Sequence, residues 1–410
     1  MNKTKPRLGI LHYAAPPTIG GVESTIAAHA RLFAEHGFAV KIIAGRGKPF
    51  DARVPVQIIP TLDSRHSFIT QVNAKLSRGI VPSDFQSLTT AIRHALENAF
   101  ADVDICIAHN ALTLHKNLAL TSALKSITEA RRVRLMAWCH DFAWDDPVYA
   151  SDLHPGMPWD LLRQKWDGVK YVTVSHTRRK EWAKLANIPE AEIAVVPPGL
   201  DISEFLGLSP TITRWAHDLH LFDAVPLLLL PARVTRRKNI ELAIEITAAL
   251  REHQLTPKLV VMGPLGPHNP ANVVYLEELR ALCHARRVTD AVIFLQEHGE
   301  VDDAMRRDLY LLADALLFTS EREGFGIPIL EAGLMRLPIF CTDLPSFRES
   351  AREYAHYFTL DEAPSAIAAR LSAELSRDAR YQMKQRVWRE YTWEHIFHER
   401  IEPLVWQGEG

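Results

Sequence analysis

The sequence predicts an α/β protein built from two Rossmann-like domains, each with a parallel sheet covered by helices on both faces. Three observations predict this fold. A chain of 410 residues is too long for one ordinary hydrophobic core. Short apolar runs alternate with amphipathic segments from the start of the chain, as parallel sheets require. The alternation stops near residue 200 and restarts after residue 224.

The first half contains six apolar runs of strand length. A helix is expected from Glu23 to His36, where Ile26, Ala30 and Phe33 share one face and a glycine follows. A second helix is expected from Asp84 to Phe100, with similar spacing. The expected strands are Arg7 to Tyr13, Phe38 to Ala44, Asp104 to Ala108, Arg134 to Cys139, Lys170 to Val174 and Glu192 to Val196.

The second half repeats the pattern after a break. The run Pro197-Pro198-Gly199 stops regular structure, and the segment to Ala224 has no strand pattern, so the linker is placed there. The predicted domains are therefore 1–200 and 201–390. The expected strands of the second are Pro226 to Leu230, Lys258 to Met262, Ala291 to Leu295, Ala315 to Thr319 and Pro338 to Cys341.

The composition is that of a soluble enzyme. Apolar residues make up 47% and charged residues 23% of the chain, which excludes disordered, collagenous and membrane-spanning classes. The apolar run near the start is too short for a signal peptide and is interpreted as the first strand. The four cysteines, Cys106, Cys139, Cys283 and Cys341, form no C-x-x-C pair and are expected to be buried thiols. These features predict a cytoplasmic protein.

The charge pattern is nearly balanced. The net charge is −2, with a small positive excess in the first 200 residues and a negative one in the rest. A solvated surface of mixed sign explains this asymmetry, although it also permits an anionic acceptor or a peripheral contact with the inner membrane surface. The sequence has no basic tract suited to nucleic acid.

The strongest motif follows the last strongly apolar strand of the second half. It reads Glu323-Gly324-Phe325-Gly326-Ile327-Pro328-Ile329-Leu330-Glu331. Its glycines allow backbone amides to approach a ligand, and a helix beginning near Pro328 would favour anions and hydroxyls at its start. Glu323 and Glu331 can each accept paired hydroxyl hydrogen bonds. The alternative is a helix cap at Glu323 and an ordinary helical position for Glu331.

Two cations follow another strand of the same half. Arg233 and Lys238 lie five residues apart, and together they could bind a diphosphate and stabilise it as a leaving group. The alternative is a solvated basic loop.

Together these residues resemble the retaining glycosyltransferases of family 4, and the resemblance covers nearly the whole chain. It implies the GT-B fold, with two Rossmann-like domains whose parallel sheets face an inter-domain cleft, and a C-terminal segment, about 391–410, that crosses back to the first domain. It also implies that Glu323 contacts the transferred sugar, Glu331 the ribose, and Arg233 with Lys238 the diphosphate.

The family also has a glycine-rich turn after the first strand. Pro16-Pro17-Thr18-Ile19-Gly20-Gly21 matches it, and the G-x-G-x-x-G of a dehydrogenase is absent. A plain strand-to-helix turn is the alternative. The donor-binding set expected from the resemblance is Gly20, Gly21, Arg233, Lys238, Glu323, Gly324, Phe325, Gly326, Ile327 and Glu331.

Two further strand ends resemble those that line the family's cleft. The resemblance places His140 beside the transferred sugar, so the catalytic set is His140, Arg233, Lys238 and Glu323. Asp141 and His109 are assigned to the acceptor side, where a structural role for His109 is the alternative. The aromatic and acidic loop 142–159, with Trp144 and Asp145, is expected to help select the acceptor, and a surface loop that folds onto its own aromatic core is the alternative.

The predicted reaction moves a glucose- or mannose-type hexose from a nucleoside-diphosphate sugar to an acceptor hydroxyl, with retention. A departing phosphate oxygen would take the proton, so neither a protein nucleophile nor a cofactor is required. No D-x-D carboxylate pair follows a strand, and a catalytic metal is therefore not expected. The alternatives are a nucleotide-sugar epimerase on the same fold and a non-catalytic sugar-nucleotide-binding subunit.

Overall fold

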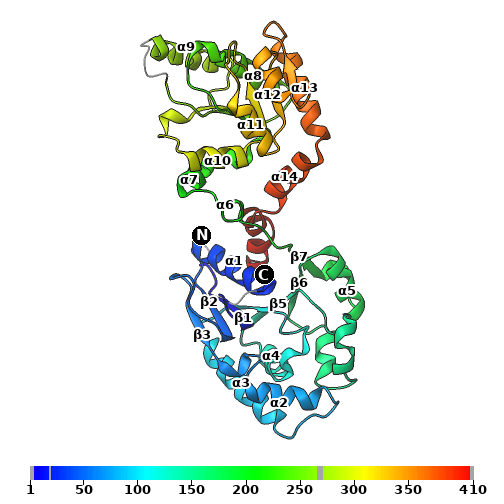
Figure 1. Cartoon of the computed structure of the whole chain (residues 1–410). Coiled ribbons are helices and arrows are strands. Elements are labelled where there is room, and N and C mark those ends of the chain that lie inside the picture. The colour runs from blue at the N-terminus through cyan, green and yellow to red at the C-terminus, as the bar shows by residue number, and fades with distance from the viewer. Residues whose placement is uncertain (1–3, 18–19, 266–270, 407–410) are drawn as a thin grey trace. The chain divides into compact units, whose positions relative to one another are not determined.

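The chain divides into two compact units, which are described separately (Figure 1). The computed structural model describes residues 4–17, 20–265 and 271–406. The first unit comprises Met1–Gly199 and Trp393–Gly410, and the second comprises Leu200–Thr392.

The first unit is built on a seven-stranded sheet of order β3-β2-β1-β4-β5-β6-β7, in which every neighbouring pair is parallel. The six strands expected from the sequence are all present, with ends shifted by at most two residues. The short edge strand β3 was not predicted. The strands are β1 (Leu8–Ala14), β2 (Val40–Arg46), β3 (Val56–Ile58), β4 (Ile105–His109), β5 (Arg134–Cys139), β6 (Lys170–Thr173) and β7 (Ile193–Val195).

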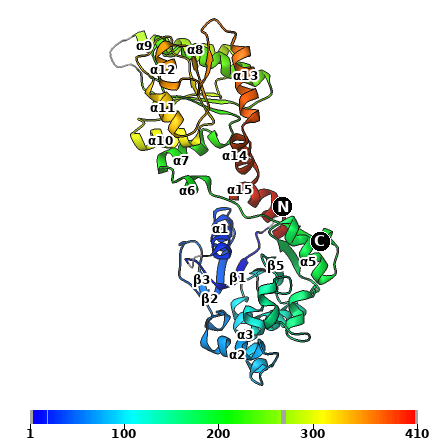
Figure 2. The same cartoon turned by 45° about the vertical axis from the view of Figure 1, so that its right-hand side comes forward.

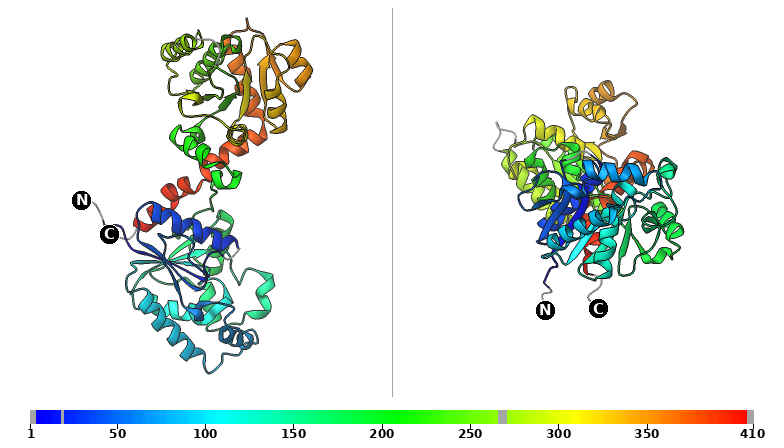
Figure 3. Two further views of the ribbon diagram at one scale, coloured as in Figure 1. Left: turned by 60° about the vertical axis from the view of Figure 1, so that its left-hand side comes forward. Right: turned by 90° about the horizontal axis from the view of Figure 1, so that it is seen from below.

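Successive residues of a strand point to opposite sides of the sheet, and both sets of side chains are buried here. In β4, Ile105 and Ile107 belong to one apolar cluster and Cys106 and Ala108 to the other. Figure 3 shows α1 lying over the sheet, on the face that the C-terminal helices also cover. This face is covered by α1 (Gly21–Glu35), α15 (Trp393–Ile396), a π-helical turn (Phe397–Ile401) and α16 (Glu402–Trp406). The other is covered by α2 (Ser67–Leu76), α3 (Phe85–Ala99), α4 (Leu118–Glu129) and α5 (His176–Ala186).

The second unit has a six-stranded sheet of order β10-β9-β8-β11-β12-β13, again wholly parallel. The five expected strands are present within one residue, and β13 is an addition. The strands are β8 (Leu227–Leu230), β9 (Lys258–Val261), β10 (Val292–Phe294), β11 (Ala315–Phe318), β12 (Ile339–Thr342) and β13 (His356–Phe358).

The helices of the second unit cover its sheet, with α8 and α13 packed side by side (Figure 2). They are α6 (Ile202–Leu206), α7 (Pro210–Asp218), α8 (Ile240–Glu252), α9 (Ala271–Ala285), α10 (Asp303–Leu312), α11 (Ile327–Leu334), α12 (Pro345–Ala351), α13 (Pro364–Arg377) and α14 (Ala379–Glu390).

The break between the units is shorter than the expected linker. The segment that follows Gly199 forms α6 and α7, and Ile212 and Trp215 of α7 are buried in the core of the second unit. Sequence periodicity missed this because α6 and α7 are short and are separated by the break Gly207-Leu208-Ser209.

Both sheets reverse their strand order at one point, between β1 and β4 in the first unit and between β8 and β11 in the second. In open α/β sheets ligands bind beyond the carboxyl ends of the strands at such a point. The four cysteines are buried free thiols, as expected. Across the described ranges, no helix combines the length and apolar character needed to cross a bilayer.

Candidate active site

In the second unit, the loops that follow β8 and β11 meet at the reversal point of the sheet. The first loop carries Arg233 and ends in the 3-10 turn Arg236–Lys238. The backbone N–H of Glu321 donates to the Arg237 carbonyl at 2.9 Å, and Thr319 Oγ1 donates to the Lys238 carbonyl at 3.0 Å. These bonds fix the two loops to each other, so the structure brings the basic loop and the glutamate motif together.

Lys238 and Glu323 form an ion pair at this junction. Their side chains are only 9% and 12% exposed. Ser320 Oγ donates to Glu323 Oε1 at 3.0 Å, and Arg237 Nη1 lies 3.4 Å from Glu323 Oε2. One carboxylate oxygen therefore has two short-range partners, and the other keeps lone pairs that a sugar hydroxyl could use.

The electrostatics of Lys238 reflect its burial. Burial lowers the pKa of the Lys238 ammonium, while the hydrogen bond and charge of Glu323 raise it. The positive charges of Arg237 and Arg233 lower that pKa further. Arg233 itself is exposed. The loop thus carries two exposed guanidinium groups, those of Arg233 and Arg237, together with the buried ammonium of Lys238, and such a set of positive charges suits an anion.

Glu331 lies on α11, which begins after Gly326. Gly326 has φ 94°, a left-handed conformation that favours glycine, and Pro328 occupies the first turn. Tyr310 of α10 donates its hydroxyl to Glu331 Oε2 at 2.7 Å, and Arg306 Nε lies 3.6 Å from Oε1. Glu331 is therefore oriented by α10, while its side chain keeps 28% exposure.

Part of the motif is accessible, whereas Gly326 and Ile329 are buried. A side chain added at Gly324 would meet open space, and Phe325 and Ile327 are exposed. Backbone amides in this stretch can therefore be reached by a ligand.

In the first unit, four histidines gather at the carboxyl ends of the strands. His12 Nδ1 lies 2.9 Å from the His109 carbonyl, and His109 Nδ1 lies 3.0 Å from His140 Nε2. The ring of His29, from α1, lies 5.5 Å from that of His109 and 4.6 Å from that of Trp138. A carbonyl only accepts, so His12 Nδ1 carries the proton of that bond.

Burial disfavours the charged form of these histidines. It lowers the pKa of His140 to about 4 and that of His29 to about 3, with neighbouring histidines adding a smaller repulsion. The pKa of His109 is also lowered, by burial first. His109 is fully buried and contacts His140, so any influence it has on an acceptor would pass through His140.

Asn110 organises the turn after β4. It adopts a left-handed conformation with φ 55°, which asparagine tolerates better than most residues. Its Oδ1 accepts the backbone N–H of His140 at 2.8 Å and that of Asp141 at 3.2 Å, and its Nδ2 donates to Asp141 Oδ2 at 3.2 Å. Asn110 thus fixes the backbone of the His140-Asp141 step.

The glycine-rich turn lies at the start of α1. Gly20 is extended, and a Cβ there would overlap the Glu23 carboxylate, whereas Gly21 is open. Thr18 and Ile19, which belong to the same motif, lie outside the described residues.

The loop after β5 folds partly on itself. Trp144 Nε1 donates to the Trp159 carbonyl at 3.1 Å, and the Arg163 guanidinium lies 4.1 Å from the Trp144 ring centre. Asp145 is exposed. Trp144 therefore supports the loop, and Asp145 is the more accessible of the two expected acceptor-side residues.

Sequence reasoning missed four residues that shape these sites: Ser320, Arg237, Tyr310 and Asn110. Ser320 and Arg237 are sequence neighbours of predicted residues, so proximity to the motif was an available signal. Tyr310 lies 21 positions before Glu331. Only the structure reveals it, through the hydrogen bond from Tyr310 on α10 to Glu331 on α11.

Two family models match the chain in succession. The model described as Glycosyltransferase Family 4 matches residues 19–204, and the one described as Glycosyl transferases group 1 matches residues 212–392. The matches correspond closely to the two halves, and the second contains Arg233, Lys238, Glu323 and Glu331.

Several characterised proteins are similar to parts of the chain. Serotype-specific mannosyltransferase WbdA of Escherichia coli is 40% identical over 92 residues, which are 22% of this chain and 10% of that protein. Mannosylglucosylglycerate synthase of Thermotoga maritima is 24% identical over 277 residues, which are 63% of this chain and 61% of that protein. The chain thus spans about a tenth and about three fifths of these relatives.

Among solved structures, Anabaena Alr3699/HepE in complex with UDP and glucose aligns over 98% of this chain and all of that one, with 16% identity and a TM-score of 0.36. The assignment does not depend on that alignment. It depends on the two family models and on the two Rossmann-like sheets. On these grounds the chain belongs to the family 4 glycosyltransferases, which have the GT-B fold.

Proposed function

We propose that this chain is a retaining glycosyltransferase that moves a glucose- or mannose-type hexose from a nucleoside-diphosphate sugar to an acceptor hydroxyl. One observation carries the proposal. Lys238 and Glu323 form an ion pair between two loops at the reversal point of the second sheet, where α/β proteins bind ligands, and Arg233 lies in the same loop as Lys238.

The donor site follows from that convergence. Arg233 and Lys238 hold the diphosphate and stabilise the charge that grows on it as the glycosidic bond breaks. The remaining lone pairs of Glu323 accept hydrogen bonds from hydroxyls of the sugar. Glu331, which Tyr310 orients, accepts hydrogen bonds from the ribose hydroxyls. Backbone amides of the exposed residues Gly324, Phe325 and Ile327 contribute neutral donors.

The first unit supplies the groups assigned to the sugar and the acceptor. His140 is neutral near pH 7 because its pKa is about 4, so its ring and carbonyl can accept or donate hydrogen bonds without adding charge. In the proposed step, the acceptor oxygen forms a bond to the anomeric carbon while the bond to the phosphate oxygen breaks. The departing phosphate oxygen takes the acceptor proton, and the configuration is retained.

Replacing Arg233 tests the proposal. Arg233→Ala is expected to lower kcat about a hundredfold or more, because a preorganised donor to developing charge contributes about 2.7 to 4 kcal/mol. The matched control is Arg236→Ala, in the same loop, since Arg236 is exposed and pairs with Glu278 at 2.6 Å. The measurement is nucleoside diphosphate released per unit time with mannose and glucose donors. Near-normal turnover in Arg233→Ala would rule out the assigned role.

The acceptor-side assignment has a separate test. Asp145→Ala is expected to retain donor hydrolysis and to lose transfer to the acceptor, because an exposed carboxylate can bind acceptor hydroxyls. Trp144→Ala is also expected to reduce transfer to the acceptor while donor hydrolysis is retained, because it loosens the loop. Unchanged acceptor kinetics in both variants would show that this loop does not select the acceptor.

A further inference from the structure

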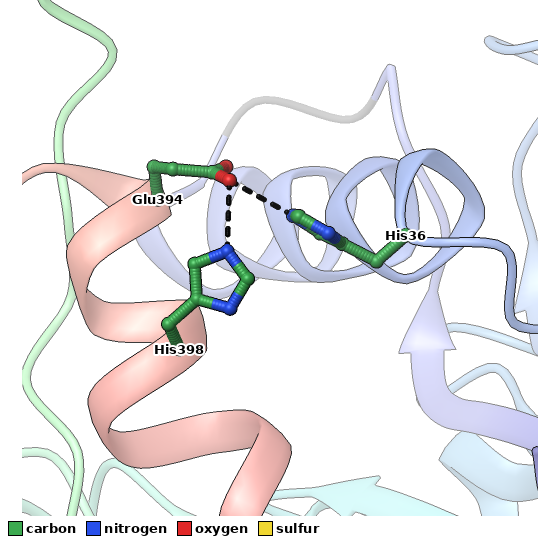
Figure 4. A group of neighbouring side chains, drawn as sticks. All are labelled: His36, Glu394 and His398. Atoms are coloured by element: carbon green, nitrogen blue, oxygen red, sulfur yellow. Dashed lines mark hydrogen bonds and ion pairs between the residues drawn. The ribbon is translucent and has the colours of Figure 1, made fainter. Parts of the chain in front are cut away.

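Two histidines and a glutamate from distant parts of the sequence meet on the surface of the first unit (Figure 4). His36 directly follows α1, Glu394 lies on α15, and His398 lies in the π-helical turn. His36 Nε2 and His398 Nε2 each lie 3.1 Å from the same atom, Glu394 Oε1. One ligand atom from each residue lies within 4.8 Å of the other two.

We propose that these three side chains bind a divalent first-row transition ion such as Zn²⁺. Tetrahedral Zn²⁺ with bonds of about 2.0 to 2.1 Å separates its ligand atoms by about 3.3 to 3.5 Å. The observed 3.1 Å separations need only a small outward shift of the side chains. Two imidazole nitrogens with one carboxylate favour zinc, nickel, copper or cobalt over magnesium and calcium, which prefer oxygen.

The surroundings of His398 support this site independently of the three ligands. His398 Nδ1 lies 3.2 Å from Glu402 Oε2. When Nε2 of a neutral imidazole binds a metal, Nδ1 carries the only N–H, and a carboxylate commonly accepts it. Glu402 is in place to do so. His398 also lies in a π-helical turn, and such turns are frequent at functional sites.

The other ligands leave room for an ion to enter. His36 is held by stacking on Phe397, with ring centres 4.3 Å apart and planes at 12°. The Glu394 and His398 side chains are 60% and 49% exposed. A water can therefore occupy the fourth position, and the ion has a path from solvent.

This site is distinct from the histidine group at His140. A crossover helix in a parallel sheet runs back toward the amino ends of the strands, so the C-terminal end of α1 lies at the opposite sheet edge from His140. A bound ion would join residue 36 to residues 394–398. It would therefore stabilise the C-terminal helices on α1 without taking part in sugar transfer.

Calorimetric titration of the metal-free full chain with ZnCl₂ tests the proposal. The expected result is one equivalent of Zn²⁺ bound per chain at micromolar protein concentration, lost in His36→Gln and in His398→Gln. Glu402→Gln is expected to weaken binding about 10- to 100-fold, because it only orients a ligand. The matched control is His94→Gln, since His94 is an exposed histidine 3.3 Å from the carboxylate of Glu97.

Hydrogen exchange supplies a second readout. Zn²⁺ is expected to slow amide exchange in residues 393–406 of the wild type and not of His398→Gln, because a ligand of the folded state opposes local opening. Circular dichroism without metal checks that the variants fold. Absence of stoichiometric binding, or equal loss in His94→Gln, would overturn the proposal. So would unchanged binding in both ligand variants.

Discussion

At the scale of single residues, the ion pair between Lys238 and Glu323 combines stability with ligand binding. Lys238→Met is expected to destabilise the second unit by about 2 to 3 kcal/mol, at the lower edge of the range for a broken buried pair, because Glu323 keeps some exposure. Urea unfolding measures this change. Lys238→Met/Glu323→Leu is expected to recover part of the loss.

The matched control for this pair is Arg236→Ala. The pair of Arg236 with Glu278 is half-exposed, so its loss is expected to cost less than about 1 kcal/mol. If Lys238→Met lowered the free energy of unfolding no more than the control, the junction of the two loops would not depend on the buried ion pair.

The residues of this junction differ in how far the sequence alone could place them. Arg233, Lys238 and Glu323 lie in the loops that follow β8 and β11, and parallel strands all end at one edge, so the meeting of these two loops could be predicted. The orientation of Glu331 could not be predicted, because it depends on Tyr310 of α10. The burial of His109 could not be predicted either, because it depends on α1 packing over the strand ends.

At the scale of elements, histidines near the ends of β1, β4 and β5 and on α1 are expected to make the stability of the first unit sensitive to acid. Their pKa values are lowered in the folded state, so the unfolded chain binds protons that the native chain does not. Stability is therefore lost as pH falls below about 6.5, down to about 4 for His140 and about 3 for His29. Each such group contributes about 1.4 kcal/mol per pH unit in this window.

Denaturant unfolding between pH 7 and pH 5 checks this expectation. His29→Phe removes one titrating group while keeping a ring beside Trp138, and it is expected to flatten the pH slope by one proton. His94→Gln, at an exposed position, should leave the slope unchanged. Equal slopes in all three proteins would contradict the assignment.

The C-terminal helices are a second element with a measurable energetic role. Phe397 is fully buried and packs against Phe33 of α1 at 5.4 Å between ring centres. Phe397→Ala is expected to destabilise the first unit by about 3 to 5 kcal/mol through the cavity that it leaves. Thermal unfolding measures it. Phe205→Ala, at a 76% exposed position, is expected to change stability by less than about 0.5 kcal/mol.

Elements were predicted best where burial is continuous. The central strands β1, β4, β8 and β11 are buried on both faces, and their sequences are therefore nearly continuous runs of apolar residues. The edge strands β3 and β13 are three residues long and partly exposed, and their few side chains carry no periodic signal. Their pairing is decided by the neighbouring strand, and the sequence could not predict it.

At the scale of the whole molecule, the chemistry proposed here assigns the leaving-group charge to Arg233 and Lys238 and includes no catalytic metal. The transfer rate in excess chelator is therefore expected to equal that in buffer, even if Zn²⁺ leaves the site at His36. Product formation with and without chelator, at a temperature where the metal-free chain remains folded, measures this. Strict dependence on added manganese would contradict the proposed leaving-group role of Arg233 and Lys238.

The core of the first unit is completed by residues 393–406, which come almost 200 positions after its last strand. During vectorial synthesis, the ribosome releases the entire second unit before these helices emerge. The usual order, in which the N-terminal domain matures first, is therefore reversed. A nascent chain arrested before Ile396 would present an uncovered apolar face around Phe33 and Phe38, and this is the surface that a chaperone would have to shield.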